Sequence, residues 1–479
     1  MHPLARLLPF LLCLPTADGI ELTREDATAR LRMARQIARE HNDRALVARV
    51  EKLGTEFSKG LPEDADARLR EAEQAVGIDP GGWSMAGQPL FHPTPEILVQ
   101  AAKLDGELEA AMQSGDPKAV LAVTAKMAQA LGDQAGVPDG RRPGVKATPV
   151  TMNQAEATRL FLDALASEKK AIDQLTSGKP LPDQMVRFYA YLLGGASTIR
   201  PFVKAHEPAR LPNLDALSSG VAGILVGLQQ PAGHFPFPDL RGRNIRFGEM
   251  IQGQINAGKV EVKDGWVITP DPDGGTQFDT GLCGVALLDA GHAYGKEEWT
   301  QAGLRAADWA LSQPCVGNFN YNAFSVSLLS RAFQETGQRK YLDGALHKFR
   351  LGVAPGQASN GRWMDAHNAR TVYHHIILRG LGDLLVALPE GSQAERAEVA
   401  EVTERALSAL LDEFDAMGLT VEGLPELLLL QNLFPENVRL RATVRTMAGS
   451  IAAKCTDGLR VKMGSAPNQL AALPRAIEP

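Results

Sequence analysis

The sequence predicts a mainly α-helical protein in which pairs of helices repeat along the second half of the chain. From Leu282 to Met417, apolar residues recur at helical spacing in segments that end at glycine or at a polar break. The first two pairs share a Gly turn followed by a charged helix start with an aromatic residue, Trp299 or Tyr341. The repeat is about 40–50 residues long, and pairs at that spacing stack into an open solenoid or a closed ring.

Composition places the chain among ordinary globular proteins. Of its 479 residues, 44% are hydrophobic and 22% are charged. This length allows two or more domains, or one large helical domain with a smaller one attached. The formal net charge of -6 gives no basic footprint, so we expect no nucleic-acid partner.

The N-terminus predicts a signal peptide over residues 1–19. Arg6 precedes the apolar run Leu7–Leu14, and small residues follow at Ala17 and Gly19. The run is too short to span a bilayer, and we expect no membrane anchor after its removal. The expected location is secreted or periplasmic, and the alternative is a frayed apolar terminus.

Cysteine usage predicts neither a metal site nor a disulfide framework. Removal of the signal leaves Cys283, Cys315 and Cys455, which permit at most one intrachain bridge. A Cys283–Cys315 bridge is conceivable, but three buried free thiols are favoured. The acidic loop from Asp271 lacks the Glu that a calcium loop needs at its twelfth position, where Leu282 stands. No metal or cofactor is therefore expected.

Residues 20–135 predict a helical N-terminal module without chemistry-bearing residues, suited to packing or to partner binding. Two of its helices have clear boundaries: Thr94-Pro95 starts one that ends at Gly115, and Asp116-Pro117 starts the next, which ends at Gly132. Helices are also expected over 20–60 and 64–76. The basic, Gly/Pro-rich stretch 136–150 is the predicted linker.

The domain over 151–460 is predicted to be helical with one β-hairpin insertion. The alternating segments Lys259–Lys263 and Trp266–Thr269 flank Asp264-Gly265, a type I′ turn signal. Prolines exclude a helix over 229–239. Expected helices cover 152–176, 183–195, 214–229, 282–294, 297–312, 322–336, 339–349, 371–388, 394–417, 422–433 and 436–455. The tail 461–479 is expected to be irregular.

Two segments resemble the (α/α) toroid of carbohydrate-active enzymes, a group that includes pectate and alginate lyases and unsaturated-uronide hydrolases. They are Gln277–Gly281, which precedes the helix pair 282–312, and Val226–Asp239. The likeness covers roughly residues 183–456 and carries over no catalytic set. It implies an inner ring of helices whose N-terminal loops face a cleft, with the hairpin over its mouth.

The segment 363–375 holds the densest group of possible proton carriers. If Asp365 or Asn368 caps the helix that follows, then residues 370, 373 and 374 share one face of it. The candidate catalytic residues are His367, Arg370, Tyr373 and His374. Arg370 would neutralise a sugar carboxylate, while Tyr or His would move the protons of a β-elimination. The alternative is that these residues are caps, core groups and hydrogen-bonded structural histidines.

Candidate substrate-binding residues lie on the loops expected before inner helices. Asn318–Phe324 alternates amides, which read sugar hydroxyls, with aromatic rings, which stack on pyranose rings. Arg241, with Arg243 and Arg246, could pair with carboxylates on an acidic sugar, although a solvated basic loop is favoured. The full set is Asp279, Asn320, Tyr321, Trp363, Asp365, Asn368 and Arg241.

These observations predict a lyase that cleaves an acidic, uronate-containing oligo- or polysaccharide by β-elimination. One alternative is a glycoside hydrolase on the same fold, with Asp279 and either Asp239 or Asp365 as its two carboxylates. Another is a toroid that binds a glycan or a protein without catalysis. The oligomeric state stays open.

Overall fold

The computed structural model describes most of the chain after residue 42. The described residues are 43–78, 84–85, 87–91, 93–141, 144–145, 147–182, 184–242, 245–270, 274–456 and 466–477, with 24, 27, 28, 30, 31, 34, 35 and 38. The predicted signal peptide, Arg243 and the acidic loop from Asp271 lie outside them, as do the side chains of Arg246 and Cys455.

The chain divides into two compact units. Unit 1 comprises Met1–Val145, Ala354–His374 and Glu404–Thr420, and unit 2 comprises the remainder, Lys146–Val353, His375–Thr403 and Val421–Pro479. The boundary after Val145 falls inside the predicted linker, but the contiguous division at residues 135 and 150 does not describe unit 1. Sequence order alone could not show that two later segments join it.

Backbone hydrogen bonds explain why the predicted linker belongs to unit 1. The amide of Gly136 donates to the carbonyl of Met364, and the amide of Asp139 donates to that of Ala366. Further along, Val145 donates to Leu419. The stretch 136–145 is thus held by partners more than 200 residues away, which a local pattern cannot predict.

The first part of unit 1 has its own small core. Helices α3 (Arg44–Lys59) and α4 (Ala65–Ala75) bury Val50, Phe57 and Leu69 together, beside the short strands β1 (Ser84–Met85) and β2 (Gln88–Pro89). Asp43 caps α3 by accepting a hydrogen bond from the amide of Leu46.

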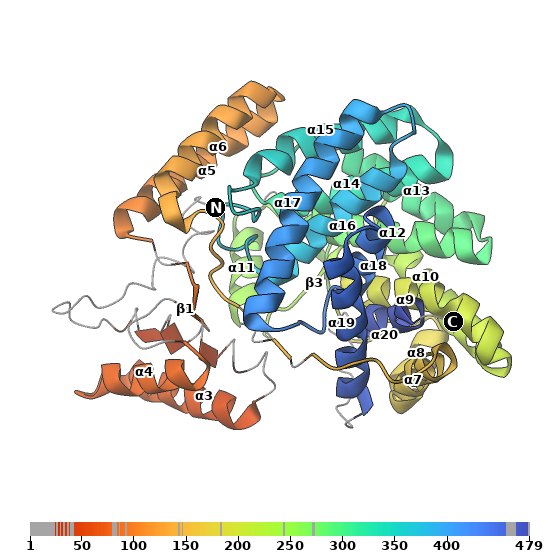
Figure 1. Cartoon of the computed structure of the whole chain (residues 1–479), viewed down its shortest axis with the longest axis horizontal. Coiled ribbons are helices and arrows are strands. Elements are labelled where there is room, and N and C mark those ends of the chain that lie inside the picture. The colour runs from red at the N-terminus through yellow and green to blue at the C-terminus, as the bar shows by residue number, and fades with distance from the viewer. Residues whose placement is uncertain are drawn as a thin grey trace. The chain divides into compact units, whose positions relative to one another are not determined.

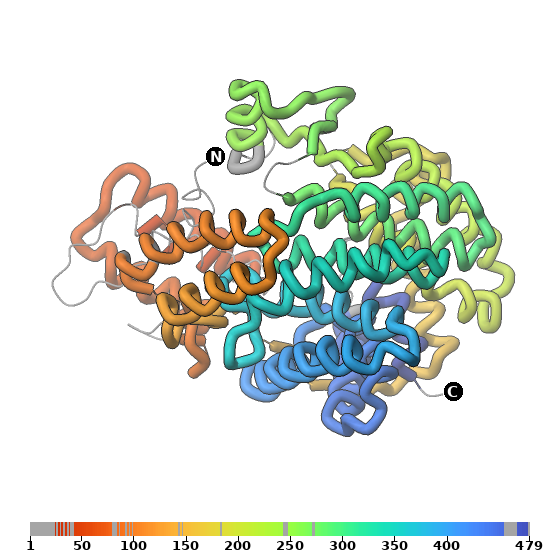
Figure 2. Tube along the Cα trace, turned by 90° about the horizontal axis from the view of Figure 1, so that it is seen from above, coloured from red at the N-terminus to blue at the C-terminus, as the bar shows by residue number. Residues whose placement is uncertain are grey.

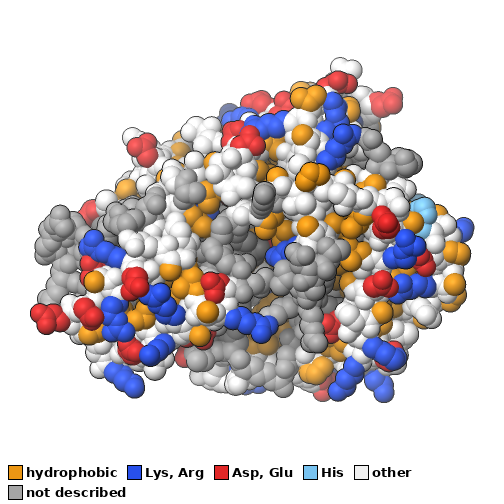
Figure 3. Space-filling view, turned by 60° about the horizontal axis from the view of Figure 1, so that its bottom comes forward, with side chains coloured by type: hydrophobic (Ala, Val, Ile, Leu, Met, Phe, Trp, Pro, Cys, Tyr) orange, Lys and Arg blue, Asp and Glu red, His pale blue; other side chains and the backbone are white. Residues whose placement is uncertain are grey.

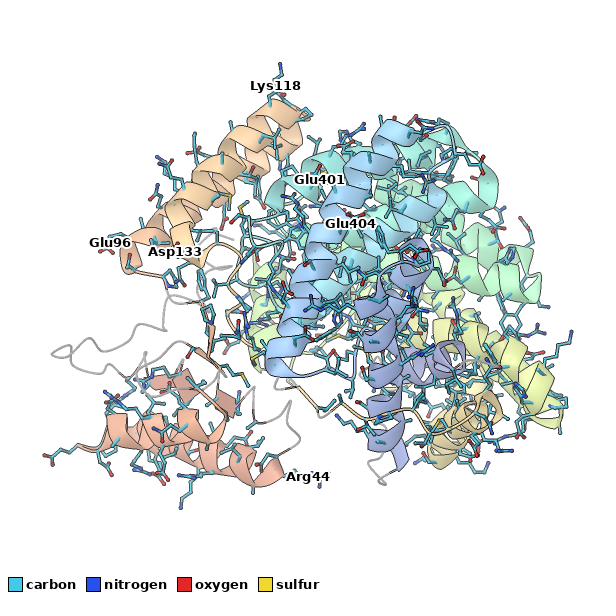
Figure 4. The ribbon with its side chains drawn as sticks, viewed as in Figure 1. Arg44, Glu96, Lys118, Asp133, Glu401 and Glu404 are labelled. Carbon is cyan, nitrogen blue, oxygen red and sulfur yellow. The ribbon has the colours of Figure 1, made fainter. Side chains whose placement is uncertain are left out.

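The hairpin of α5 (Pro95–Ser114) and α6 (Pro117–Leu131) confirms both predicted helices (Figure 1). The Thr94 side chain accepts from the amide of Ile97, and that of Asp116 accepts from the amide of Lys118. Gly115 ends α5 with a φ of 71°, a left-handed conformation that suits glycine. Figure 4 shows Glu96 and Lys118, which begin the two helices, at opposite ends of the antiparallel pair. The 3-10 turn η1 (Gly132–Gln134) follows.

Unit 2 is built from helical hairpins. Its elements are α7 (Gln154–Ser167), α8 (Lys169–Thr176), α9 (Val186–His206), η2 (Pro208–Arg210), α10 (Leu211–Leu228), α11 (Ile245–Asn256), α12 (Gly275–Tyr294), α13 (Glu297–Ser312), α14 (Phe319–Thr336), α15 (Arg339–Gly352), most of α16 (Thr371–Ala387), the start of α17 (Gln393–Met417), α18 (Leu424–Leu433), α19 (Val438–Thr456), α20 (Ala466–Ala472) and η4 (Leu473–Ala476). The short η3 (Ala354–Gly356) belongs to unit 1. Figure 2 shows α12–α15 as tubes lying side by side.

Burial separates inner from outer helices. Helix α12 is buried almost continuously from Gln277 to Gly291, and α14 is buried almost continuously from Phe319 to Ala332. Their partners α13 and α15 bury one face and expose the other. A helix that is buried all round lies inside a layer of others, whereas a one-sided helix covers it. The helical repeat therefore forms two concentric layers rather than an open stack.

The inner layer closes on itself. Among the described residues, α9 packs on α12, α12 on α14, α18 on α20, and α20 on α9. Helix α16 fills the remaining gap through two glycines: a Cβ on Gly380 would lie 2.6 Å from the Ala323 carbonyl oxygen of α14, and one on Gly382 would lie 2.8 Å from Leu429 of α18. We call α9, α12, α14, α16, α18 and α20 the inner ring.

Residues from opposite ends of unit 2 complete the ring. The C-terminal helix α20 approaches α9 so closely that a Cβ on Gly195 would lie 2.9 Å from the Pro467 carbonyl oxygen. The Gln154 side chain of α7 donates to the carbonyls of Pro474 and Ile477. The predicted irregular tail is therefore wrong for residues 466–476, because burial of Leu470 and Leu473 orders them as helix.

The predicted β-hairpin is confirmed and gains a third strand. Strands β4 (Val262–Lys263) and β5 (Trp266–Val267) pair in antiparallel register, and β3 (Phe237–Pro238) pairs with the other edge of β5. Asp264 and Gly265 have φ values of 51° and 82°, as a type I′ turn requires. Leu240, Ile251 and Val267 form a separate small core beside the hairpin.

Among the described residues, one stretch, Pro208–Leu228, is long and apolar enough to cross a membrane by length and composition. The core helix of a water-soluble protein passes the same test. Helix α10 packs against α8 and α9 and buries Leu214, Leu217 and Val221, which accounts for its apolar character.

Candidate active site

The N-terminal halves of inner helices α9, α12 and α14, the unit 2 part of α16 from His375 onward, and the start of α18 gather at one end of the ring. Arg187 of α9 makes a bidentate ion pair with Asp279 of α12, with N–O distances of 2.9 and 3.0 Å. Phe278 lies under the Arg187 guanidinium at 4.2 Å and meets the Tyr321 ring of α14 edge-on at 6.3 Å. Three helix starts therefore contribute to one cluster of polar and aromatic groups.

The other side of this end is formed by α16, α18 and α20. Gly423 precedes α18 with a φ of 95°, and a Cβ there would lie 2.4 Å from the His375 ring. The amide of Leu424 donates to the side chain of Gln469 on α20. Glycine at 423 therefore lets the start of α18 approach α16 and α20 at the same time.

A small cavity lies within the inner ring near this end. Its polar lining comes from Tyr191, Ser327, Arg379 and Glu426, and its apolar lining comes from α12, α14 and α16. The free volume of about 20 Å³ suffices for a water molecule but not for a sugar ring.

Glu426 is an acidic residue that lines this cavity. Burial raises the pKa of its carboxyl, which the nearby Arg379 only partly offsets at an N–O distance of 3.8 Å. Its Oε2 is buried and has no hydrogen-bond partner among the described residues. The raised pKa shifts this carboxyl toward its protonated form, in which it can donate to a bound molecule.

Arg379 links Glu426 to a second buried carboxyl. Its Nε lies 3.7 Å from Asp383, whose carboxylate also accepts a hydrogen bond from Ser327 of α14. Burial raises the pKa of Asp383 as well. Burial raises the pKa of Tyr191 to about 12, so this phenol is a proton donor at neutral pH rather than a base.

Of the site residues predicted in this unit, three lie at the gathered helix ends and one does not. Asp279, Asn320 and Tyr321 are there, but within the first two turns of α12 and α14 rather than on preceding loops. Both helices begin earlier than expected because burial of Phe278 and Phe319 draws these turns into the core. Arg241 is instead exposed and ion-paired with Asp239 at 2.8 Å, the solvated alternative of the prediction.

The predicted segment 363–374 belongs to unit 1, where its polar groups make internal contacts. Arg370 pairs with the buried Asp139. His374 is fully buried, with Nε2 2.7 Å from the Ala406 carbonyl oxygen, and its ring packs edge-on against the buried Trp363. The rings of His367 and Tyr373 lie 4.0 Å apart, and both side chains are partly exposed.

Neither of the two expected caps begins α16. The Asp365 carboxylate accepts from the amide and the side chain of Asn368, which closes a turn inside the loop. Helix α16 starts later, at Thr371. Arg370 therefore precedes the helix and does not share a helical face with Tyr373 and His374, contrary to the prediction. Cys283 and Cys315 are buried free thiols, so the favoured prediction holds for both.

The sequence prediction missed Arg187, Tyr191, Arg379 and Glu426. Glu426 follows Gly423-Leu424-Pro425, a pattern that reads as an ordinary acidic first turn of a helix. Its one usable signal was position, because it lies near the start of the helix predicted over 422–433, which follows the repeated helix pairs. The other three occur inside helices, where no local pattern distinguishes them.

A closed inner ring of helices covered by outer helices defines unit 2 as an all-α (α/α) toroid, with an N-terminal helical module in unit 1. No family model matches the sequence, and no curated protein matches it.

The solved structures that are similar to the chain include two glycoside hydrolases. A GH76 α-mannanase from Bacteroides thetaiotaomicron has a TM-score of 0.42 and 10% identity, over 66% of this chain and 95% of the other. A GH127 β-arabinofuranosidase has a TM-score of 0.43 and 14% identity, over 69% of this chain and 61% of the other. At such TM-scores and identities the likeness decides nothing about reaction or substrate.

Proposed function

We propose that the protein is a carbohydrate-active enzyme of the glycoside hydrolase type, with its active site at the gathered helix ends of the inner ring. The observation that carries this proposal is Glu426, which lines a water-sized cavity with one buried oxygen unpartnered. The first residues also suggest secretion of this enzyme.

Two carboxyl groups in different environments suit glycoside hydrolysis. Glu426, whose pKa is raised by burial, would protonate the departing glycosidic oxygen. Asp279, whose buried carboxylate is ion-paired with Arg187, would be the second carboxyl and would stabilise the oxocarbenium-like transition state through its charge. The half-buried Tyr321 would offer an aromatic face to the sugar.

The contacts in unit 1 favour hydrolysis over the predicted β-elimination. A lyase would need Arg370 to neutralise the substrate carboxylate, but this guanidinium already pairs with Asp139. Of the three acid/base candidates, His374 has no exposed surface. His367 and Tyr373 are partly exposed, and their rings pack against each other. We therefore advance the hydrolase, the alternative that the sequence left open, as the main proposal.

Glu426→Gln tests the role of the general acid. The amide keeps the size of the side chain but cannot donate a carboxyl proton, so we expect turnover to fall by about 10²–10⁴-fold. Release of reducing sugar from a panel of neutral and acidic polysaccharides measures it. Asp279→Asn should lose activity on the same substrate.

Glu401→Gln is the matched control, because Glu401 is an exposed carboxylate on α17 (Figure 4). It should keep full activity. Wild-type turnover in Glu426→Gln would refute the assignment. A product that absorbs in the ultraviolet, as an unsaturated uronide does, would show that the reaction is elimination and not hydrolysis.

A further inference from the structure

Arg141 of unit 1 is a buried cation with no counter-ion among the described residues. Arg141 is only 7% exposed. Its Nε is buried and has no hydrogen-bond partner in the part of the chain that the structure describes. Among the described residues, Arg141 makes no ion pair or side-chain hydrogen bond. Burial lowers its pKa to about 10, which still leaves the guanidinium charged at neutral pH.

Other buried or half-buried arginines of unit 1 are compensated. Arg362 pairs with Glu413 and donates to the carbonyls of Ala369 and Ala409. Arg370 pairs with Asp139, and Arg30 with Glu73. Arg141 is near enough to Arg362 for the two charges to repel, which adds to the effect of burial in lowering the pKa of Arg362 to about 9.

An uncompensated buried charge strongly destabilises a folded protein, so it persists where it serves a purpose other than stability. Binding an anion would supply the missing charge. The Nε of a guanidinium, together with one Nη, matches the two oxygens of a carboxylate in a planar, bidentate arrangement.

We propose that Arg141 anchors a binding site for a carboxylate group. Among the described arginines of unit 1 considered above, Arg141 alone is unpaired and calls for a single negative charge, since the neighbouring Arg362 pairs with Glu413. A carboxylate supplies one charge, whereas a sulfate or phosphate dianion would leave an excess. The carboxylate could belong to an acidic sugar or to a small carboxylic acid. The proposal for Arg141 does not depend on the proposed hydrolase function.

Calorimetric titration of the full-length protein with sodium glucuronate, sodium acetate, sodium sulfate and glucose tests the site. We expect glucuronate to bind, with at least a tenfold loss of affinity in Arg141→Met, and glucose not to bind. Equal affinity for acetate and glucuronate would identify the carboxylate alone as the ligand, and a preference for glucuronate would identify an acidic sugar. Binding of sulfate alone, or of none of the anions, would overturn the proposal.

Thermal unfolding separates a binding role from a structural one. Without ligand, Arg141→Met removes an unpaired charge, so its Tm should rise by about 2–4 °C. The control Arg362→Met leaves the buried Glu413 without its ion pair, although Thr371 still donates to it, so its Tm should fall. A fall of similar size in Arg141→Met, with glucuronate affinity unchanged, would show that Arg141 is structural.

Discussion

Burial sets the charge state of individual carboxyl groups in both units. In unit 1 it raises the pKa of Asp365 to about 6, although Asn368 donates two kinds of hydrogen bond to that carboxylate. In unit 2 it raises the pKa of Glu426. Asp365 was singled out from its sequence neighbours and Glu426 was not, because burial depends on residues distant in the chain.

Asp365 makes a pH-dependent contribution to stability that can be measured. Its carboxyl binds a proton more tightly in the folded protein, near pH 6, than in the unfolded chain, near 3.8. The stabilisation is therefore present below about pH 4 and is lost as the pH rises through 6, by at most about 3 kcal/mol. Asp365→Asn removes this loss.

Urea unfolding at pH 4 and pH 7 checks that sign. The free energy of unfolding of Asp365→Asn, minus that of the wild type, should increase between the two pH values. Asp343→Asn, which removes an exposed carboxylate from α15, controls for the change in net charge. A difference that stays constant or decreases would contradict the prediction.

Individual elements follow local signals where their ends are exposed. The α5–α6 hairpin and the type I′ turn at Asp264-Gly265 formed as predicted, since capping and turn chemistry act over a few residues. Helix α12 began seven residues earlier than the predicted Leu282, because Phe278 and Asp279 are held by α9 and α14. Tertiary contacts thus decided the boundaries that position the site.

Close approach between inner helices depends on glycine. In Gly380→Ala the new methyl would lie 2.6 Å from the Ala323 carbonyl oxygen, so α14 and α16 must move apart. We expect a loss of about 1–3 kcal/mol in the free energy of unfolding. Chemical denaturation measures it.

Gly223→Ala is the matched control on α10, where a Cβ would meet nothing within 4 Å. Alanine is the better helix former there, so this variant should gain up to about 1 kcal/mol. A Gly380→Ala protein as stable as Gly223→Ala would show that the inner helices are not in tight contact.

The whole toroid requires both ends of unit 2. α7 comes from its first residues and α20 from its last, and Gln154 joins them through the carbonyls of Pro474 and Ile477. These hydrogen bonds and the packing of α20 on α9 close the ring. On the face drawn in Figure 3, acidic and basic side chains are interspersed.

Deletion of residues 466–479 should open the ring beside Gly195. The loss of buried Leu470 and Leu473 should lower the unfolding midpoint and expose α9 to proteolysis. Limited trypsin digestion and thermal unfolding measure both effects. As a control, a chain that ends at Ile477 keeps these contacts and should behave as the full chain does. If the protein without residues 466–479 resists trypsin as well as the full chain, ring closure by α20 is refuted.

The sequence by itself determined the helical hairpins and the β-hairpin, because helical periodicity, caps and turns are local. Of the candidate site residues, Asp279, Asn320 and Tyr321 lie in the first two turns of α12 and α14, whereas the predicted catalytic residues 367–374 lie in unit 1. Only the tertiary structure decided that residues 354–374 join unit 1, that the inner ring closes, and that Glu426 and Arg141 are buried without full compensation. Whether a side chain is buried, and whether it has a counter-ion, depends on how segments distant in the sequence pack together. The proposed roles of Glu426 and Arg141 depend on both.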